Sequence, residues 1–384
     1  MNLSADTTER KPISMQRLAL AFVCPNMVLA RDVYDQDGTI MVSAGTALTE
    51  RLIALLKNWE ILSVFVCNPQ IVLPPIPEAA QEATRNRARL MVEHAFNMIR
   101  RAEQFSISED EQKTVHCVVE EATQDPRALI HIAHIDRNSR DILSHSVNVA
   151  LLSTTTALSL GINSSEPLHE LALAALLHDI GLLMIPQDLI ARRGSLTSEE
   201  FAIYREHSNW GHAILTQAAN LPDSIAKVAQ EHHETANGTG YPAQLTRQTL
   251  HPFSRIVSAV NVYENLCSGA IDCKGCQAYL AYESIMAGAG TRFDLKIAKA
   301  LLSRIPMYPI GSLVELTNGL VGVVMSTSQD MPHRPQLKIF ANSDESVLEL
   351  PFLLDLADLD NQTVFIQEVL NDERAARFIG DSSS

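Results

Sequence analysis

The sequence has few features of an exported, membrane-spanning or nucleic-acid-binding protein. Its longest apolar runs, such as LALAALL before His178, are too short to cross a bilayer. No convincing secretory cleavage pattern follows the apolar LALAFV near the N-terminus. The formal net charge of −15 leaves little of the basic surface that general nucleic-acid binding requires. We therefore expect a cytoplasmic protein that binds no DNA and does not insert into a membrane.

Cysteines are also few, and their spacing is unlike that of a disulfide-stapled protein. Six cysteines are scattered over 384 residues. Cys273 and Cys276 form a single CxxC pair, and Cys267 lies six residues before it. A structural zinc site needs a fourth ligand and usually a second such pair. The pattern therefore favours reduced thiols in a loop over a zinc site.

Helical patterns dominate the middle of the chain, and extended patterns occupy both ends. Strand-like runs flank Asp37-Gly38 and Asn318-Gly319, two dipeptides that are typical of hairpin turns. The predicted fold class is mainly α: an all-helical domain between a small N-terminal α+β module and a small C-terminal β-rich cap. The predicted divisions are a disordered N-terminus (1–14), the α+β module (15–68), a Pro-rich linker (69–77), connecting helices (78–136), the helical domain (137–306), the cap (307–370) and a tail (371–384).

Two of the predicted helices carry features of interest outside any motif. A helix over 82–105 has an apolar face that includes Leu90, Met91 and Met98, and this face allows homodimerisation. Thr197 and Glu200 form a capping box, which predicts the start of a helix that carries His207.

Two adjacent histidines, His232 and His233, end an apolar helical run before a turn built on Gly238 and Gly240. Adjacent side chains on a helix point about 100° apart, so these two cannot bind one ion in the same way. They can serve two ions of one cluster, or one of them can bind an ion while the other supports a ligand.

Other candidate ligands come from separate predicted helices of the same domain. Nitrogen and oxygen ligands from several helices are what a cluster of divalent metal ions needs. Paired cations of this kind can activate water and stabilise charge in phosphoryl transfer. The candidate ligands in chain order are His145, His178, Asp179, His207, His232 and His233.

The order of several motifs resembles a known family. HSVNVA, LLHDIGLLMIP, SLTSEEFAIYREH, EHHETANGTGYP and RIVSAVNVYENL follow one another between about residues 137 and 306. This order resembles the HD-GYP domain, a branch of the HD metal-dependent phosphohydrolases. The resemblance implies an enzyme of bacterial second-messenger signalling that hydrolyses cyclic di-GMP to pGpG or GMP. It also implies two or three divalent ions, iron or manganese, as cofactors.

Carried onto this sequence, the resemblance implies a role for each matching residue. His178 and Asp179 would be catalytic, with Asp179 able to bridge two metal ions. Tyr241, Gly240 and Lys274 would contact the substrate. The implied metal ligands are His145, His178, Asp179, His207, His232 and His233, with Asp141 and Asn261 at further ligand positions.

The sequence departs from the family pattern at positions that bind metal or phosphate. Leu182 stands where the family has a lysine over the phosphate, and Asn261 stands where it has an aspartate ligand. Asn237 replaces an aspartate before Gly238. In the segment SGAIDCKGCQAY, Lys274 is the one remaining basic residue.

These departures leave two other functions open beside the cyclic di-GMP phosphodiesterase. One is a catalytically weakened domain that senses cyclic di-GMP or acts as a scaffold for other signalling proteins. The other is a hydrolase for a different phosphoester.

Overall fold

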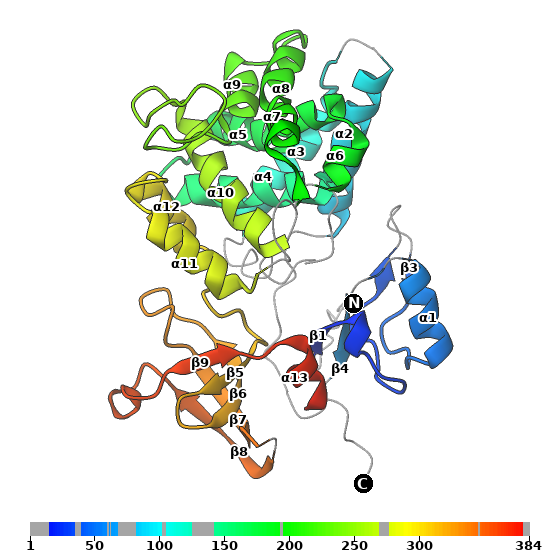
Figure 1. Ribbon diagram of the computed structural model, residues 1–384, viewed down its shortest axis with the longest axis vertical. Coiled ribbons are helices and arrows are strands. Elements are labelled where there is room, and N and C mark those ends of the chain that lie inside the picture. Colours follow the sequence, from blue (N-terminus) through cyan, green and yellow to red (C-terminus); the bar gives the residue numbers. More distant parts are fainter. Residues whose placement is uncertain are drawn as a thin grey trace, which may run out of the picture. The chain divides into compact units, whose positions relative to one another are not determined.

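The computed structural model describes residues 15–34, 40–59, 61, 63–67, 82–101, 105–124, 142–192, 195–268, 276–344 and 346–378. The chain divides into two compact units, which are described one at a time (Figure 1). Unit 1 combines the two ends of the chain, Met1–Pro77 and Tyr308–Ser384, and unit 2 is Glu78–Met307.

Unit 1 contains the strands at both ends of the chain. In the N-terminal segment, β1 pairs with β4 and β2 pairs with β3, each in antiparallel fashion. The C-terminal segment forms a five-stranded sheet in the order β8-β7-β6-β5-β9 (Figure 1). The N-terminal elements are β1 (Met15–Ala19), η1 (Leu20–Phe22), β2 (Val33–Tyr34), β3 (Ile40–Val42), α1 (Glu50–Asn58) and β4 (Ser63–Cys67). The C-terminal elements are β5 (Leu313–Leu316), β6 (Leu320–Ser326), β7 (Gln336–Asn342), β8 (Val347–Asp355), η5 (Leu359–Asn361), β9 (Ile366–Val369) and α13 (Asp372–Arg377).

One of the two predicted hairpin turns lies within the described residues. β5 and β6 pair antiparallel across Asn318-Gly319, and Gly319 has a φ of 78°, a conformation that favours glycine. That hairpin prediction is confirmed. Asp37-Gly38 lies outside the described residues, although the strands before and after it, β2 and β3, do pair antiparallel.

The two segments of unit 1 share one hydrophobic core. Leu18, Leu29 and Val66 from the N-terminal segment belong to the same buried cluster as Phe340 and Phe378 from the C-terminal segment. In addition, the backbone N–H of Ala19 donates to the carboxylate of Asp372, with N and Oδ2 3.1 Å apart. The sequence predicts these segments as two separate modules. A hydrophobic pattern shows that a face is buried but not which segment covers it.

Unit 2 is built from helices, as the sequence predicts, and the predicted fold class is confirmed. Most residues of α4 and α5 are buried. The elements are α2 (Glu82–Arg100), α3 (Glu109–Gln124), α4 (Ile142–Ser159), α5 (Ser165–Leu177), η3 (Ile180–Met184), α6 (Gln187–Ala191), α7 (Ser198–Arg205), α8 (His207–Thr216), α9 (Asp223–Glu231), α10 (Pro252–Ser268), α11 (Ala278–Gly288) and α12 (Leu295–Leu302).

The predicted capping box is present, but the helix that it opens ends before His207. The Thr197 side chain accepts from the backbone N–H of Glu200, whose carboxylate accepts from the N–H of Thr197. This helix, α7, ends at Arg205, and His207 is the first residue of α8. The prediction that one helix carries both features is therefore wrong, because the backbone N–H of Glu206 bonds to the carbonyls of Ile203 and Tyr204 and tightens the last turn.

One stretch of the described residues, Ser165–Met184, is long and apolar enough to cross a membrane by length and composition. Its apolar window is 72% buried inside the structure. This burial fits a helix of the domain core, because α5 packs against α3, α4 and α9.

A buried carboxylate, Glu111, stabilises the start of α3. Its contribution to the free energy of folding depends on pH. Glu111 accepts from the backbone N–H and hydroxyl of Ser108, both at 2.7 Å, and bonds to His94 Nδ1 at 2.8 Å. Burial alone would raise the pKa of Glu111, but the bonds from Ser108 and His94 lower it below its usual value. The ionised group therefore stabilises the fold above its unfolded pKa, and this contribution is lost as the pH falls through the lower folded pKa.

We expect Glu111→Gln to lower the free energy of unfolding by about 1 kcal/mol at pH 7, as measured by urea titration. The difference from wild type should shrink as the pH is lowered toward 4. Glu109→Gln, at an exposed position on the same turn, is the control and should change little. A difference for Glu111→Gln that is constant with pH would contradict the assignment.

Candidate metal centre

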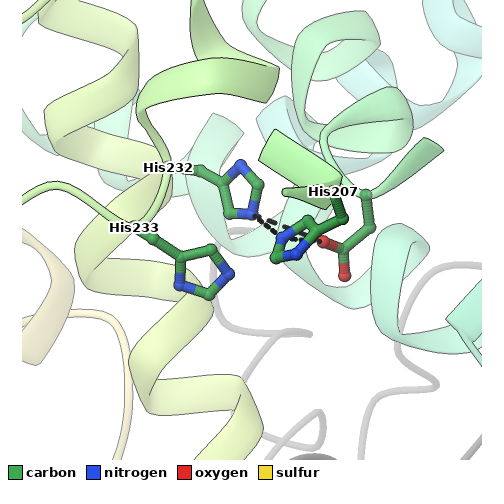
Figure 2. A group of neighbouring side chains, drawn as sticks. His207, His232 and His233 are labelled. Atoms are coloured by element: carbon green, nitrogen blue, oxygen red, sulfur yellow. Dashed lines mark hydrogen bonds and ion pairs between the residues drawn. The ribbon is translucent and has the colours of Figure 1, made fainter. Parts of the chain in front are cut away.

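The structure brings six of the predicted site residues together in unit 2. His145 lies on α4, and His178 with Asp179 directly follows α5. His207 begins α8, and His232 and His233 follow α9. All are buried except His233, which is partly exposed. Figure 2 shows His207, His232 and His233 side by side, with the rings of His207 and His232 turned toward each other.

Three of these histidines sit just beyond a helix end, and this position fixes their rings. The last carbonyls of a helix lack an N–H partner within the helix. In each case the ring Nδ1 lies within hydrogen-bond distance of the carbonyl three residues earlier. The pairs are His178 with Ala175 (2.7 Å), His207 with Tyr204 (2.7 Å) and His232 with Ala229 (2.8 Å).

Because a carbonyl only accepts, each Nδ1 carries the proton, and each Nε2 presents a lone pair. The Nε2 atoms face one another in pairs: His207 and His232 are 3.2 Å apart, and His145 and His178 are also 3.2 Å apart. Facing lone pairs repel each other unless a cation lies between them. The donor arrangement therefore fits bound metal ions.

The carboxylate of Asp179 lies between the two histidine pairs. Its Oδ1 is 3.3 Å from His232 Nε2 and 3.6 Å from His207 Nε2. Its Oδ2 is 3.4 Å from His178 Nε2 and 3.7 Å from His145 Nε2. Among the described residues, no donor hydrogen-bonds to the buried Oδ1. One carboxylate thus offers one oxygen to each pair.

The ligand atoms form two groups that share Asp179. One group is Asp179, His207, His232 and His233, and the other is His145, His178 and Asp179; within each, the ligand atoms lie within 4.8 Å of one another. The buried Nε2 of His233 has no hydrogen-bond partner among the described residues. Imidazole and carboxylate ligands suit divalent transition metals. Both groups together can hold two neighbouring ions.

The electrostatics of the cluster keep the ligands in the forms that bind metal. Burial lowers the pKa of His178 to about 3, despite the opposing effect of Asp179, so this imidazole is neutral at pH 7. Burial and the neighbouring rings of His232 and His207 hold the pKa of His233 well below its usual value. Burial alone would raise the pKa of Asp179, but the surrounding imidazoles hold it well below its usual value.

Two glycines allow the backbone around the cluster to pack closely. A Cβ on Gly181 would lie 2.0 Å from the carbonyl oxygen of His207 and 2.4 Å from the N of Gly211. A Cβ on Gly240 would lie 2.5 Å from both the Cα of Glu234 and the carbonyl oxygen of His233. Glycine at 181 therefore sets the distance between η3 and α8, and glycine at 240 folds the loop back onto His233.

Tyr241 lies beside the cluster, next to a positive charge. Its ring stacks on His233, with the centroids 4.6 Å apart and the planes at 19°. The guanidinium carbon of Arg205 on α7 lies 4.4 Å from the centre of the same ring. The predicted contact residue is thus close to the ligands, and sequence reasoning missed Arg205, which lies two residues before His207.

The other predicted site residues are not among the clustered ligands. Asn261 is buried on α10, where its Oδ1 accepts from Asn265 Nδ2 at 2.8 Å, and its role as a ligand stays a prediction. Asp141 and Lys274 lie outside the described residues. Leu182 is buried among Ile185, Leu189 and Tyr204. Its aliphatic side chain therefore fills an apolar cluster.

Sequence reasoning also missed a carboxylate that supports the site. Glu264 on α10 is buried, and its Oε2 bonds to Nδ1 of His145. The signal for it was weak: an acidic residue three positions after Asn261, 119 residues from the histidine that it contacts.

Fold and ligand set together define a helical domain that binds divalent metal ions. Residues 127–297 match the family described as "HD domain", and residues 313–378 match the "KOW domain associated with HD domain". Residues 127–297 thus form an HD domain, and the motifs within them follow the order of the HD-GYP branch.

Two curated relatives are 30% and 26% identical to this chain over the aligned residues. It is 30% identical over 223 residues to "Cyclic di-GMP phosphodiesterase PA4108" of Pseudomonas aeruginosa, covering 58% of this chain and 53% of that protein. It is 26% identical over 227 residues to "Cyclic di-GMP phosphodiesterase PdeB" of Borreliella burgdorferi, covering 59% of each. The chain thus spans little more than half the length of these relatives.

Among solved structures, this chain matches Bd1817, described as a HDG"Y"P protein, from Bdellovibrio bacteriovorus. The TM-score is 0.49 at 19% identity, over 75% of this chain and 98% of that chain.

Proposed function

We propose that this chain is a metal-dependent phosphodiesterase that hydrolyses cyclic di-GMP to pGpG or GMP. The observation that carries the proposal is the Asp179 carboxylate between two pairs of facing Nε2 atoms, an arrangement suited to two adjacent cations. The names of the curated relatives support the choice of cyclic di-GMP as the substrate.

In this proposal each residue of the cluster has a definite task. Asp179 would hold both ions, and the histidine Nε2 atoms would complete the two sites. The Nδ1 bonds to Ala175, Tyr204 and Ala229 keep the lone pairs of His178, His207 and His232 aimed inward. When bound, two divalent ions supply Lewis acidity that activates water and stabilises charge on the phosphate oxygens. Tyr241 and Arg205 contact the nucleotide beside His233.

Iron or manganese is the proposed metal. Both accept mixed imidazole and carboxylate ligands. A third ion would require Asp141 or Asn261 as ligands. We place the chain in the cytoplasm, and homodimerisation through the helix over 82–105 stays a prediction.

The proposal is tested by metal analysis and turnover of one anaerobically purified preparation. We expect about two iron or manganese ions per chain and hydrolysis of cyclic di-GMP that stops after chelation and returns with added Mn²⁺. Bis(p-nitrophenyl) phosphate and 3′3′-cGAMP serve as comparison substrates. Preference for either of these would indicate a different phosphoester hydrolase.

Fewer than one metal ion per chain would contradict the metal centre itself. Full metal content without turnover of any substrate would favour the sensor or scaffold alternative. In that case, binding of cyclic di-GMP measured by calorimetry separates a sensor from a scaffold.

A further inference from the structure

A buried hydrogen-bond chain connects α2 to His145. Arg85 on α2 donates through Nη1 to Asn148 Oδ1 at 3.1 Å. Asn148 on α4 donates through Nδ2 to Glu264 Oε1 at 3.0 Å. The other oxygen of Glu264 bonds to His145 Nδ1 and accepts from the Ser268 hydroxyl at 3.2 Å. Each of these side chains is at most 9% exposed.

His145 needs this support because of its position within a helix. The other three histidines follow helix ends, where a backbone carbonyl three residues earlier accepts the Nδ1 proton. His145 is the fourth residue of α4, so the carbonyls of its own helix are already bonded to backbone N–H groups. Its Nδ1 bonds instead to a carboxylate of another helix, Glu264 on α10.

Glu264 in turn needs partners, because a buried carboxylate without donors is costly. Asn148 and Ser268 supply two neutral donors, and Arg85 supplies the positive charge on the far side of Asn148. Arg85 also sets the orientation of the Asn148 amide: because its guanidinium only donates, it holds the amide oxygen and leaves Nδ2 facing Glu264.

We infer that Arg85, Asn148 and Glu264 are positioning residues that set the tautomer and orientation of His145. Through them α2 controls metal binding at the group formed by His145, His178 and Asp179. This inference rests on the proposed metal centre. The group that contains His207, His232 and His233 does not depend on these hydrogen bonds. Backbone carbonyls orient the rings of His207 and His232 instead.

The position of α2 in the sequence indicates which part of the chain could influence metal binding through it. α2 is the first described helix of unit 2, and in the sequence it follows the Pro-rich segment that leads from the N-terminal part of unit 1. A displacement of α2 that breaks the Arg85–Asn148 bond would free the amide to turn and would leave Glu264 with one donor fewer.

The first test measures the tautomer of His145 in metal-free protein by ¹⁵N NMR of histidine-labelled samples, with His145→Gln to assign the signal. Wild type is expected to hold the proton on Nδ1. Arg85→Met and Glu264→Gln should populate the Nε2–H tautomer. Arg87→Met, at an exposed position on the same helix, is the matched control and should match wild type. An unchanged His145 signal in both Arg85→Met and Glu264→Gln would overturn the inference.

The second test measures metal affinity by competition with a chelator. Arg85→Met should bind one ion as wild type does and the other roughly 10- to 100-fold more weakly, with Arg85→Lys intermediate. A purely structural role would lower the melting temperature and leave both affinities unchanged, and that result would overturn the inference. Failure of wild type to bind metal would contradict the proposed function, while the tautomer measurement would still decide the role of Arg85.

Discussion

Replacement of Asp179 by asparagine is expected to abolish binding of both metal ions and to reduce cyclic di-GMP turnover on the order of 1,000-fold. Asp179 is the residue that both ligand groups share, with Oδ1 toward His207 and His232 and Oδ2 toward His178 and His145. An amide keeps the shape of the side chain but lacks the charge that offsets two cations. Metal content by mass spectrometry and turnover on the same samples measure both effects.

Two comparisons make this result specific. Asp188→Asn on α6, whose side chain is 70% exposed, should behave as wild type. His145→Ala should lose one ion and keep the other, because His145 belongs to one group only. Two ions retained in Asp179→Asn would show that the carboxylate does not bridge the sites.

The second large effect is expected for Gly181→Ala, which changes no polar group. The added Cβ would lie 2.0 Å from the carbonyl oxygen of His207 and 2.4 Å from the N of Gly211, so η3 and α8 must move apart. We expect the free energy of unfolding to fall by about 3 kcal/mol and metal content to fall with it, because both helices carry or adjoin ligands. Chemical denaturation and metal analysis measure the two quantities.

Gly211→Ala on α8 is the matched control for this steric argument. There the nearest atom to an added Cβ is the Cβ of Ala229 at 3.3 Å, a contact that a small shift relieves. The loss of stability should be under about 1 kcal/mol. Equal losses of stability for the two substitutions would show that the close backbone contact at Gly181 does not cause the effect.

Much of the metal cluster could be predicted because its signals are local. His178-Asp179 follows an apolar run, and His232-His233 ends another. Each motif therefore predicts a candidate metal ligand at a helix end. Their order along the chain then indicated the family. The roles of Asp141 and Lys274 stay predictions, because both lie outside the described residues.

Other features could not be predicted because they depend on contacts between distant residues. Glu264 and His145 are 119 residues apart, and no periodicity links them. Leu182 is read from the sequence as a missing phosphate contact, and the structure adds that it fills an apolar cluster with Ile185, Leu189 and Tyr204. A lysine at this position would have to bring its ammonium group through that cluster to reach a phosphate.

Periodicity and short motifs were enough to predict the helical class of the central domain, the hairpin at Asn318-Gly319 and the order of the candidate metal ligands. Tertiary structure alone decided that both ends of the chain share one core, because hydrophobic faces do not specify their partners. It also decided that Asp179 lies between two histidine pairs and that Arg85 and Glu264 support His145. These contacts exist only once separate helices have packed together.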